Sequence, residues 1–292
     1  MHNQKVLMNT YPQYITEKFQ PLMELTKLPN NLRVSTVTIT CSFDTEFNLI
    51  NIGKYINLSN DGILSVKYGN NPDNIRTLLI KKKKTKKSKK SKKMFYNQNT
   101  LLITSKSGKI INVKIFLNGS IQMTGCNDLN NCIDVLNTLC IECIKVKGIL
   151  EDEKINEIHF ATKPENLDIS KVQNIQIRMI NCNFKLGFKI NRNKLYEILL
   201  SQNIECIFEP IVHACVNIKY NYKNTNKISI FVFESGSIII TGAKNKDHII
   251  AAYQFITTKL FQTYNKIVIS NLDEILKKPE IQYLINKSLT IH

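Results

Sequence analysis

The sequence predicts an α+β protein made of two tandem copies of one unit, each an antiparallel sheet with helices on one face. The first observation is a repeated segment: residues 116–125 (FLNGSIQMTG) and 233–242 (FESGSIIITG) agree at six of ten positions. The second is an upstream pair, 34–43 (VSTVTITCSF) and 175–184 (IQIRMINCNF), whose members both end in Cys-x-Phe. The third is that both pairs occur in the same order, which indicates an internal duplication.

Each copy predicts the order strand, helix, four strands, helix. The helix-like stretches that follow the first strand are 45–56 and 191–201. Alternating apolar residues at 110–115 and 226–232 predict strands that lead into the repeated segment, and long helix-like stretches follow at 127–144 and 245–261. Consecutive strands joined by short connections form an antiparallel sheet, which can leave one face without a helical cover.

A tight turn interrupts the repeated segment in both copies. Asn118-Gly119 and Ser235-Gly236 stand between two β-like runs. Both Asn and Gly tolerate positive φ, so the dipeptide Asn-Gly is among the strongest hairpin signals. We therefore predict a two-residue turn at each position.

The spacing of the repeats sets the domain boundaries. Cys41 and Phe116 are 75 residues apart, whereas Cys182 and Phe233 are 51 residues apart, so the first copy holds about 24 additional residues. A lysine-rich run accounts for them. We expect an N-terminal extension (1–29), a first repeat (30–147) with a basic insertion (71–94), a second repeat (168–262) and a C-terminal helical extension (263–292), interrupted at Pro279.

The charge points to a polyanionic partner. The 292 residues include 40 Lys and Arg against 23 Asp and Glu, a net charge of +17. Residues 81–93 (KKKKTKKSKKSKK) hold 10 of these lysines, so only +7 belongs to the rest of the chain. A run of this composition is solvated and contacts phosphates or serves as a nuclear import signal, two roles that the sequence does not separate. Nucleic acid is the simplest partner.

Enzyme, metal and membrane functions find little support in the sequence. The five histidines are scattered, and neither a P-loop nor a Ser-His-Asp order occurs. Cys140 and Cys143 have metal-ligand spacing but lie in an apolar helical pattern without a second such pair, so we interpret the eight cysteines as structural thiols. No run of about 18 apolar residues exists, which excludes a spanning helix. We expect no enzyme activity, no cofactor, no metal and no membrane partner, and the N-terminus lacks the apolar stretch of a secretion signal.

Four segments carry a resemblance to the TATA-box-binding protein family. They are the signature FxSGxxxxTGAK at 233–244, VSTVTITC at 34–41, VQNI at 172–175 and Phe-Glu-Pro at 208–210. The resemblance covers about 31–262, is specific in the second copy and is diverged in the first. With its composition and insertion, the chain looks most like the divergent TATA-binding proteins of giant DNA viruses, which implies action in the nucleus or in a viral factory, with packaging in the virion left open.

The resemblance implies a saddle-shaped antiparallel sheet whose concave face lies on the DNA minor groove. In the family, phenylalanines wedge between base steps and kink the duplex by about 80°. Phe116 and Phe233 match the inner wedge of each repeat. The outer wedge falls on His213 in the second repeat and on Tyr96 in the first, with Phe95 as the alternative.

The resemblance also implies the residues that read the groove. Asn174 matches a central asparagine, whose counterpart in the first repeat maps to Leu32 beside Asn31. The remaining matches are symmetric threonines at Thr124 and Thr241, apolar contacts at Val34 and Ile239, and glutamines in place of valines at Gln122 and Gln176. Lys219 stands at a phosphate-contacting arginine position, and Lys244 matches a family lysine whose counterpart in the first repeat is Asn127. These departures predict DNA binding with an altered sequence preference.

Partners follow from the same resemblance. It implies double-stranded AT-rich DNA, a factor-IIB-like protein that contacts Glu209, and the RNA polymerase machinery. The helix at 127–144 carries no Lys or Arg, so partners that use that face in relatives need not be retained. A homodimer through the concave face is left open. The alternative function is an architectural or regulatory DNA-binding protein with the same saddle and no TATA specificity. A third reading, an accessory module of an enzyme, needs a catalytic domain that the roughly 60 residues outside the repeats do not supply.

Overall fold

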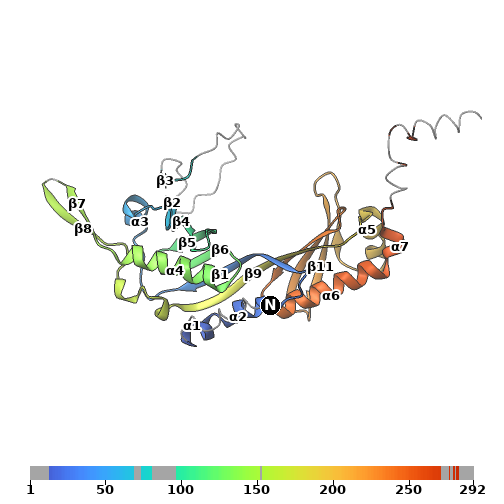
Figure 1. Ribbon diagram of the computed structural model, residues 1–292, viewed down its shortest axis with the longest axis horizontal. Helices are drawn as coiled ribbons and strands as arrows, with labels where there is room; N and C mark the ends of the chain where they lie inside the picture. The colour runs from blue at the N-terminus through green and yellow to red at the C-terminus, as the bar shows by residue number, and fades with distance from the viewer. Residues whose placement is uncertain are drawn as a thin grey trace, which may run out of the picture. The chain divides into compact units, whose positions relative to one another are not determined.

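The computed structural model describes residues 13–68, 74–80, 97–151, 153–270 and the single positions 276, 279, 281 and 282 (Figure 1). The chain divides into two compact units. Unit 1 comprises Met1–Lys27 and Ser35–Ile180, and unit 2 comprises Leu28–Val34 and Asn181–His292. The whole lysine run (81–93), with Phe95 and Tyr96, lies outside the described residues.

The sheet of unit 1 is antiparallel. Its strands are, in spatial order, β1 (Arg33–Ser42), β6 (Ser120–Cys126), β5 (Ile110–Phe116), β4 (Gln98–Thr104), β2 (Ile63–Tyr68) and β3 (Ile75–Thr77). Strand β3 belongs to the predicted basic insertion, so part of that insertion extends the sheet by pairing with β2. The guanidinium of Arg76 donates to the carbonyls of Gly53 and Ile56 and ties this edge strand to the helix beside it.

One face of this sheet is covered by helices and forms the core of unit 1. Strand residues alternate between the two faces. Accordingly, Ile121 and Met123 of β6 are at most 1% exposed, whereas Gln122 between them is half-buried. Helices α3 (Leu49–Tyr55) and α4 (Leu129–Ile144) bury their apolar sides on this face (Figure 1). The opposite face of the sheet is free of helices in the part of unit 1 that the structure describes, and we call it the open face.

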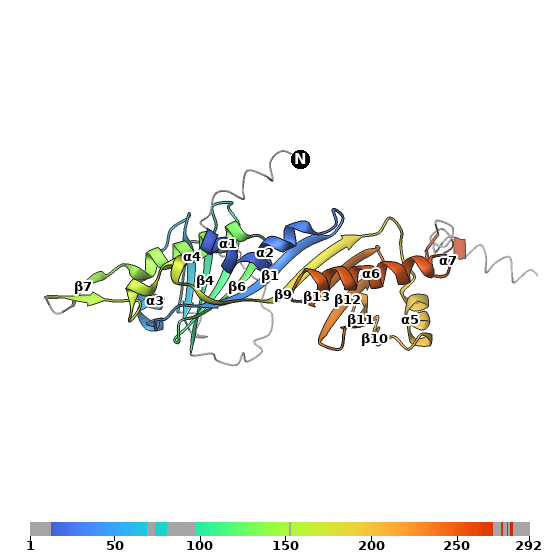
Figure 2. The same cartoon turned by 90° about the horizontal axis from the view of Figure 1, so that it is seen from below.

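The N-terminal extension packs against unit 1. It contains α1 (Gln13–Lys18), α2 (Gln20–Met23) and the 3-10 helix η2 (Glu24–Lys27), and Phe19 is fully buried. The ammonium of Lys18 donates to the carbonyls of Ser170 (2.6 Å) and Val172 (3.0 Å). These contacts hold α1 against η5 (Ile169–Lys171), as Figure 2 shows.

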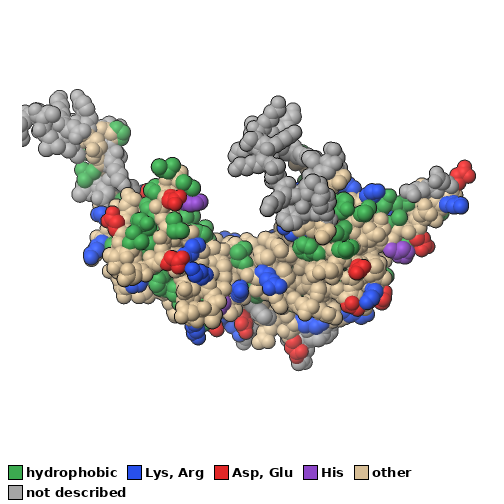
Figure 3. Space-filling model, turned by 180° about the vertical axis from the view of Figure 1, so that it is seen from behind, with side chains coloured by type: hydrophobic (Ala, Val, Ile, Leu, Met, Phe, Trp, Pro, Cys, Tyr) green, Lys and Arg blue, Asp and Glu red, His purple; other side chains and the backbone are tan. Residues whose placement is uncertain are grey.

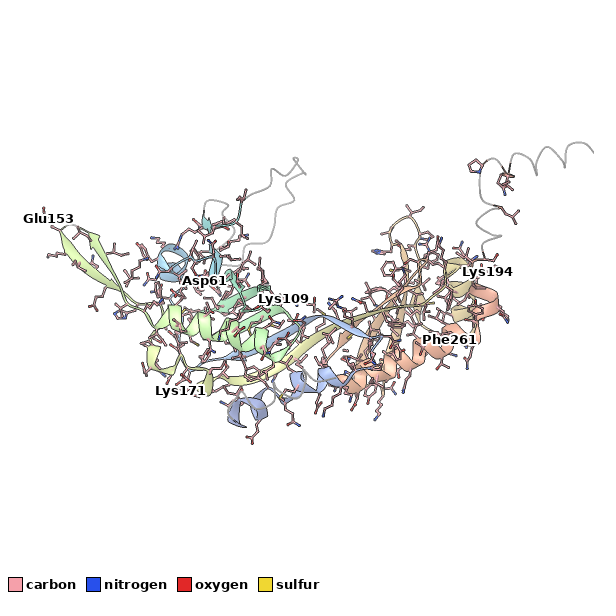
Figure 4. All side chains as sticks on the ribbon, viewed as in Figure 1. Asp61, Lys109, Glu153, Lys171, Lys194 and Phe261 are labelled. Carbon is pink, nitrogen blue, oxygen red and sulfur yellow. The ribbon has the colours of Figure 1, made fainter. Side chains whose placement is uncertain are left out.

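A hairpin follows α4 in unit 1. Strands β7 (Lys147–Glu151) and β8 (Lys154–Ile158) form a separate two-stranded sheet, and Glu153 lies at its tip, away from the large sheet (Figure 4). The chain then passes through η4 (Pro164–Asn166) to η5. The sequence did not predict this hairpin, because its residues are mostly polar and its two strands add little to the core.

Unit 2 has the element order that the repeat predicts. After β9 (Gln173–Lys185) come α5 (Arg192–Ser201), β10 (Cys206–Ile207), β11 (Cys215–Tyr222), β12 (Asn226–Phe233), β13 (Ser237–Ala243), α6 (Lys246–Gln262) and the short α7 (Tyr264–Ile267). The strands lie in the order β10-β11-β12-β13-β9, and β9 begins within unit 1. Helix α6 packs across β11, β12 and β13 (Figures 1 and 2), so this sheet also has one covered and one open face.

The hairpin turns differ from the two-residue turns expected. Three residues separate β5 from β6 and β12 from β13. The N–H of Gly119 donates to Phe116 O (3.2 Å) and that of Gly236 to Phe233 O (3.1 Å), and only the glycine of each turn has positive φ, at 79° and 78°. A turn closed by a glycine in the left-handed region is a common three-residue hairpin loop. Both glycines are therefore required, but Asn118 and Ser235 are not in the left-handed region.

Backbone contacts fix the register of the duplication. The N–H of Phe43 donates to Gly119 O, and that of Leu186 donates to Gly236 O. Phe43 and Leu186 are therefore equivalent, a spacing of 143 residues. The match of the two Cys-x-Phe segments implies 141, so it is wrong by two residues: the position of Cys41 corresponds to Phe184.

Most of the cysteines lie in the core of the fold. All eight cysteines are free thiols, and six of them are buried. Burial raises the pKa of the Cys41 and Cys140 thiols to about 12, so both are protonated at neutral pH. Within the described residues, three or more potential metal ligands nowhere gather, and no helix has the length and apolar character needed to cross a membrane.

Candidate nucleic-acid interface

The open face of unit 2 is built from β11, β12 and β13. Phe231 lies directly opposite Ile239, and Ser229 lies opposite Thr241. These side chains are half-buried, while the neighbours that alternate with them point into the core. The ammonium of Lys219 donates to Ser229 Oγ (2.8 Å), so this lysine is fixed on the sheet. The result is an apolar strip with a polar border.

The symmetric threonines have side-chain partners in both units. Thr241 Oγ1 donates to Asn181 Oδ1 (2.5 Å) in unit 2. Thr124 Oγ1 and Thr38 Oγ1 lie 3.4 Å apart in unit 1, where either hydroxyl is the donor. Each threonine thus stands on the open face beside a second polar group. A hydroxyl held in this way is a donor or acceptor of fixed position.

The open face of unit 1 is more polar than that of unit 2. A shallow hollow there is lined mainly by hydroxyl and amide side chains, with the predicted wedge Phe116 among them. Asn174 Nδ2 donates to Ser42 Oγ (3.0 Å), and Arg178 Nε donates to Thr40 Oγ1 (2.9 Å). The other lining side chains include those of Ser120, Gln122 and Gln176.

Asn174 itself has unusual backbone geometry. Its φ is +54°, in the left-handed region that asparagine tolerates better than most residues. The position lies at the second residue of β9, and its side chain is exposed except for the bond to Ser42. The predicted central asparagine is thus present on the open face of unit 1.

The loop between β10 and β11 carries the predicted outer wedge of unit 2. His213 is exposed, and its N–H donates to Glu209 O (2.8 Å). Ile211 and Val212 stand before it, with 101% and 65% of their surface exposed. An exposed aliphatic pair therefore accompanies the histidine. The counterpart in unit 1, Tyr96, lies outside the described residues.

Arg192 anchors that loop from the start of α5. Its guanidinium donates to Ala214 O (2.7 Å) and to Glu234 Oε2 (2.7 Å), and it lies 5.5 Å from the centre of the Phe208 ring. Glu234 follows Phe233 directly in the chain. One arginine thus connects the loop to the turn that carries the predicted inner wedge.

The remaining site residues predicted from the sequence differ in how far they are exposed. Leu32 is 5% exposed and belongs to the core, so it does not take the role of Asn174 in the first repeat. Its neighbour Asn31 donates to the Tyr253 hydroxyl (2.7 Å). Val34 is half-buried in β1. The side chains of Lys244, Asn127 and Glu209 are exposed.

Sequence reasoning missed three open-face residues, Lys114, Arg178 and Phe231. The signal that could have found them is strand alternation, because Arg178 follows Asn174 and Gln176 at a period of two. Lys114 and Phe231 lie directly opposite the predicted Gln122 and Ile239.

Charged side chains are scattered on the face that Figure 3 presents. Lysine and arginine side chains lie there among uncharged ones, and several stand next to acidic side chains. Phe261 on α6 illustrates the helical side of unit 2, where it is 61% exposed and points away from the sheet (Figure 4). Flat open faces with apolar, hydroxyl and amide groups are suited to the shallow minor groove of DNA, which offers mainly acceptors.

The fold and its open faces define a class: tandem-repeat α+β proteins that bind through a sheet face. Comparison with known proteins identifies the family. Residues 174–263, the second repeat, match the family model of transcription factor TFIID, or TATA-binding protein. A TATA-box-binding protein-like protein of Acanthamoeba polyphaga mimivirus is 42% identical over 277 residues, which cover 88% of this chain and 72% of the relative. The chain belongs to the TATA-binding protein family, whose members are DNA-binding transcription factors and not enzymes.

Among solved structures, the TATA-binding protein of Methanococcus jannaschii is similar to this chain. The similarity has a TM-score of 0.47 at 18% sequence identity, and it covers 80% of this chain and 99% of the archaeal one.

Proposed function

We propose that this chain is a general transcription initiation factor that binds AT-rich promoter DNA in the minor groove and bends it. The observation that carries the proposal is the equivalent placement of Phe116 and Phe233. Each phenylalanine ends a strand, stands half-buried at the border of an open face and is followed by a glycine-closed turn. Each open face also presents a threonine hydroxyl two residues beyond Gln122 or Ile239.

Wedging is the physical role that suits these rings. Inserting an apolar side chain between base steps costs a few kcal/mol of unstacking and allows a bent duplex to contact more protein surface. The interior of each face then supplies apolar contact and hydroxyl or amide groups for the acceptors of A·T pairs. Lys219 and Lys244 add phosphate contacts, which position the protein without reading sequence.

The wedge proposal is tested by replacing both rings. The variant Phe116→Ala/Phe233→Ala should abolish bending of an AT-rich duplex labelled with two fluorophores, and should weaken binding at least about tenfold, since stacking of one base contributes roughly 1–3 kcal/mol. Phe261→Ala is the matched control, because that ring is exposed on the helical side. An unaltered energy-transfer signal in the double variant would remove the wedges from this proposal.

A second candidate function is an architectural protein without TATA specificity. The polar open face of unit 1, with Gln122, Gln176 and Arg178 in one hollow, and the exposed His213 favour it. Selection of bound duplexes from a random library at near-physiological salt separates the two. Enrichment of an AT-rich element supports promoter recognition, whereas strong binding with no motif and a steep salt dependence supports the architectural function.

We further propose that the loop after β10 recruits a factor-IIB-like protein, and through it the RNA polymerase machinery. The exposed carboxylate of Glu209 and the exposed Ile211 and Val212 offer a charge beside apolar surface. Glu209→Arg should leave the binary DNA complex unchanged and abolish the ternary complex in a gel-shift assay. Loss of the binary complex, or an intact ternary complex, would contradict this role. The viral relative supports action in the nucleus or a viral factory.

The lysine run and the open faces suggest two further solution properties. If 81–93 supplies only electrostatic attraction, its deletion should flatten the salt dependence of affinity equally for all DNA sequences. A loss at one sequence alone would show that the run reads DNA. Apolar faces that bind DNA also favour a homodimer when DNA is absent. Sedimentation with and without duplex tests this, because DNA should dissociate such a dimer.

A further inference from the structure

The open faces of the two units differ at one pair of directly opposite residues. In unit 2, Phe231 faces Ile239 across β12 and β13. In unit 1, the equivalent pair is Lys114 and Gln122 across β5 and β6, 117 residues earlier. All four side chains are half-buried and alternate with residues that are at most 1% exposed, so they share the open face of their own unit.

The surroundings of each pair reinforce the difference. In unit 1, the hollow that contains Gln122 also contains Gln176 and the guanidinium of Arg178. In unit 2, Phe233 follows Phe231 on the same side of β12, so the strip remains apolar up to the turn. In each unit the pair lies two residues along the strand from the symmetric threonine, Thr124 or Thr241. Both pairs therefore face the same part of a bound duplex in their respective halves.

The chemistry of the minor groove makes this difference selective. A·T pairs present only acceptors there, whereas a G·C pair adds the 2-amino donor of guanine. An apolar surface removes water from that amino group and offers no hydrogen-bond acceptor in its place. A buried donor without a partner is costly. The carboxamide of glutamine accepts from the amino group through its oxygen and donates to A·T acceptors through its nitrogen. Unit 2 therefore excludes guanine, and unit 1 accommodates it.

We propose that the DNA element of this protein is chemically asymmetric: the half-site under unit 1 accepts G·C pairs, and the half-site under unit 2 accepts only A·T pairs. This inference rests on the proposed minor-groove binding. It assigns Gln122, with Lys114 beside it, and the pair Phe231 and Ile239 as specificity-determining residues. The asymmetry also selects one of the two orientations in which a two-repeat protein can lie on DNA.

The test uses four duplexes and works in whichever orientation the protein lies on them. One has an all-A·T core, one has a G·C pair in the left half, one has it in the right half, and one has it in both. A protein with one tolerant half turns round to place that half on the guanine. Each single substitution should therefore weaken binding less than about threefold, and the double substitution should weaken it more than about tenfold, since a mismatched pair costs roughly 1–3 kcal/mol.

Base analogues identify the amino group without changing the protein. Inosine pairs with cytosine but lacks the 2-amino group, so inosine in both halves should restore the affinity of the all-A·T duplex. If each single substitution accounts for half of the free-energy cost of the double substitution, the two halves are equivalent and the inference is overturned. Failure of inosine to rescue the double substitution would overturn it as well.

Exchanged pairs test the assigned residues. Lys114→Phe/Gln122→Ile should make a single G·C substitution cost more than about tenfold, because neither half then accepts guanine. Phe231→Lys/Ile239→Gln should make the double substitution cost less than about threefold. Unchanged profiles in both folded variants would remove these residues from the inference. If the wild-type protein binds the all-A·T duplex no better than an all-G·C duplex, the proposed function fails first, and that result differs from equal penalties in the two halves.

Discussion

Asn48 and Asn191 have the same two roles, 143 residues apart. Each side chain caps a helix: Asn48 Oδ1 accepts from the N–H of Asn51 (3.0 Å), and Asn191 Oδ1 accepts from that of Lys194 (3.1 Å). Each backbone N–H donates to the segment after the long helix of its unit, at Phe160 O (2.9 Å) and Ile267 O (2.7 Å). In each repeat, one asparagine thus caps a helix through its side chain and connects that helix to the end of the repeat through its backbone N–H.

The caps give the first prediction. Asn48→Ala and Asn191→Ala should each lower the free energy of unfolding by about 1 kcal/mol, because the helix loses the acceptor for a terminal N–H. Urea denaturation followed by circular dichroism measures this. Asn→Gly at the same positions should cost only a few tenths of a kcal/mol. An alanine variant as stable as the wild type would show that the cap does not contribute.

The turn glycines give the second prediction. A Cβ at Gly119 would lie 2.3 Å from Phe43 O, and one at Gly236 would lie 2.3 Å from Phe188 O. Both residues also have positive φ. Gly119→Ala and Gly236→Ala should therefore each destabilise the protein by more than about 2 kcal/mol, since strain in the left-handed region adds to the clash.

Gly187→Ala is the matched control for the turn glycines. A Cβ there meets no atom within 4 Å, and its φ is not in the left-handed region. Its melting temperature should stay near that of the wild type. An equal loss of stability in all three variants would mean that the contacts with Phe43 and Phe188 are not the cause.

His248 gives a prediction for the pH dependence of stability. It is 8% exposed at the start of α6, and burial, with the charge of Lys244, lowers its pKa below the usual 6.5. The unfolded chain then binds more protons than the folded one as the pH falls below about 6.5. Stability should therefore be full above that pH and should decrease below it.

The first repeat supplies the control for this histidine. Asn131 is equivalent to His248, 117 residues earlier, and its N–H also donates to the helix cap, at Asp128 Oδ1 (2.8 Å). His248→Asn should keep the fold and reduce the loss of stability between pH 7 and pH 5, measured by urea titration. A variant with the same pH profile as the wild type would assign the effect to other groups.

Two cysteines give a footprint of the proposed interface. Cys206 and Cys215 are half-buried, while the other six are buried. Cys215 lies opposite Phe233 on the open face of unit 2, whereas Cys206 lies opposite the core residue Ile218. Bound DNA should slow the alkylation of Cys215 severalfold and leave that of Cys206 unchanged, as mass spectrometry of peptides would show. Equal protection of both thiols would contradict contact through the open face.

The sequence predicted what depends on local pattern. The alternation of 226–232, the turn glycines and the apolar period of the helix at 245–261 are local features, and the corresponding elements β12, β13 and α6 are found with those boundaries to within a few residues. The family could also be recognised from the sequence, because the signature around Phe233 is short and contiguous.

The failures have a physical reason in common. The register of the two first strands is set by hydrogen bonds from Phe43 and Leu186 to distant turns, which sequence similarity between Cys-x-Phe segments does not detect. The counterpart of Asn174 was mapped to Leu32, which the fold buries. The bond between Arg178 and Thr40 could not be foreseen because it joins strands 138 positions apart. Each of these depends on contacts between remote segments.

The β7–β8 hairpin makes this protein convenient to label. Its strands form a sheet of their own, and its tip at Glu153 lies away from the large sheet. Leu150 and Ile155, which pair across it, are 71% and 74% exposed, so its removal leaves no cavity behind. We expect a peptide tag inserted at the tip to be tolerated. The hairpin is thus a point at which single molecules can be attached to a surface without a change in the core of unit 1.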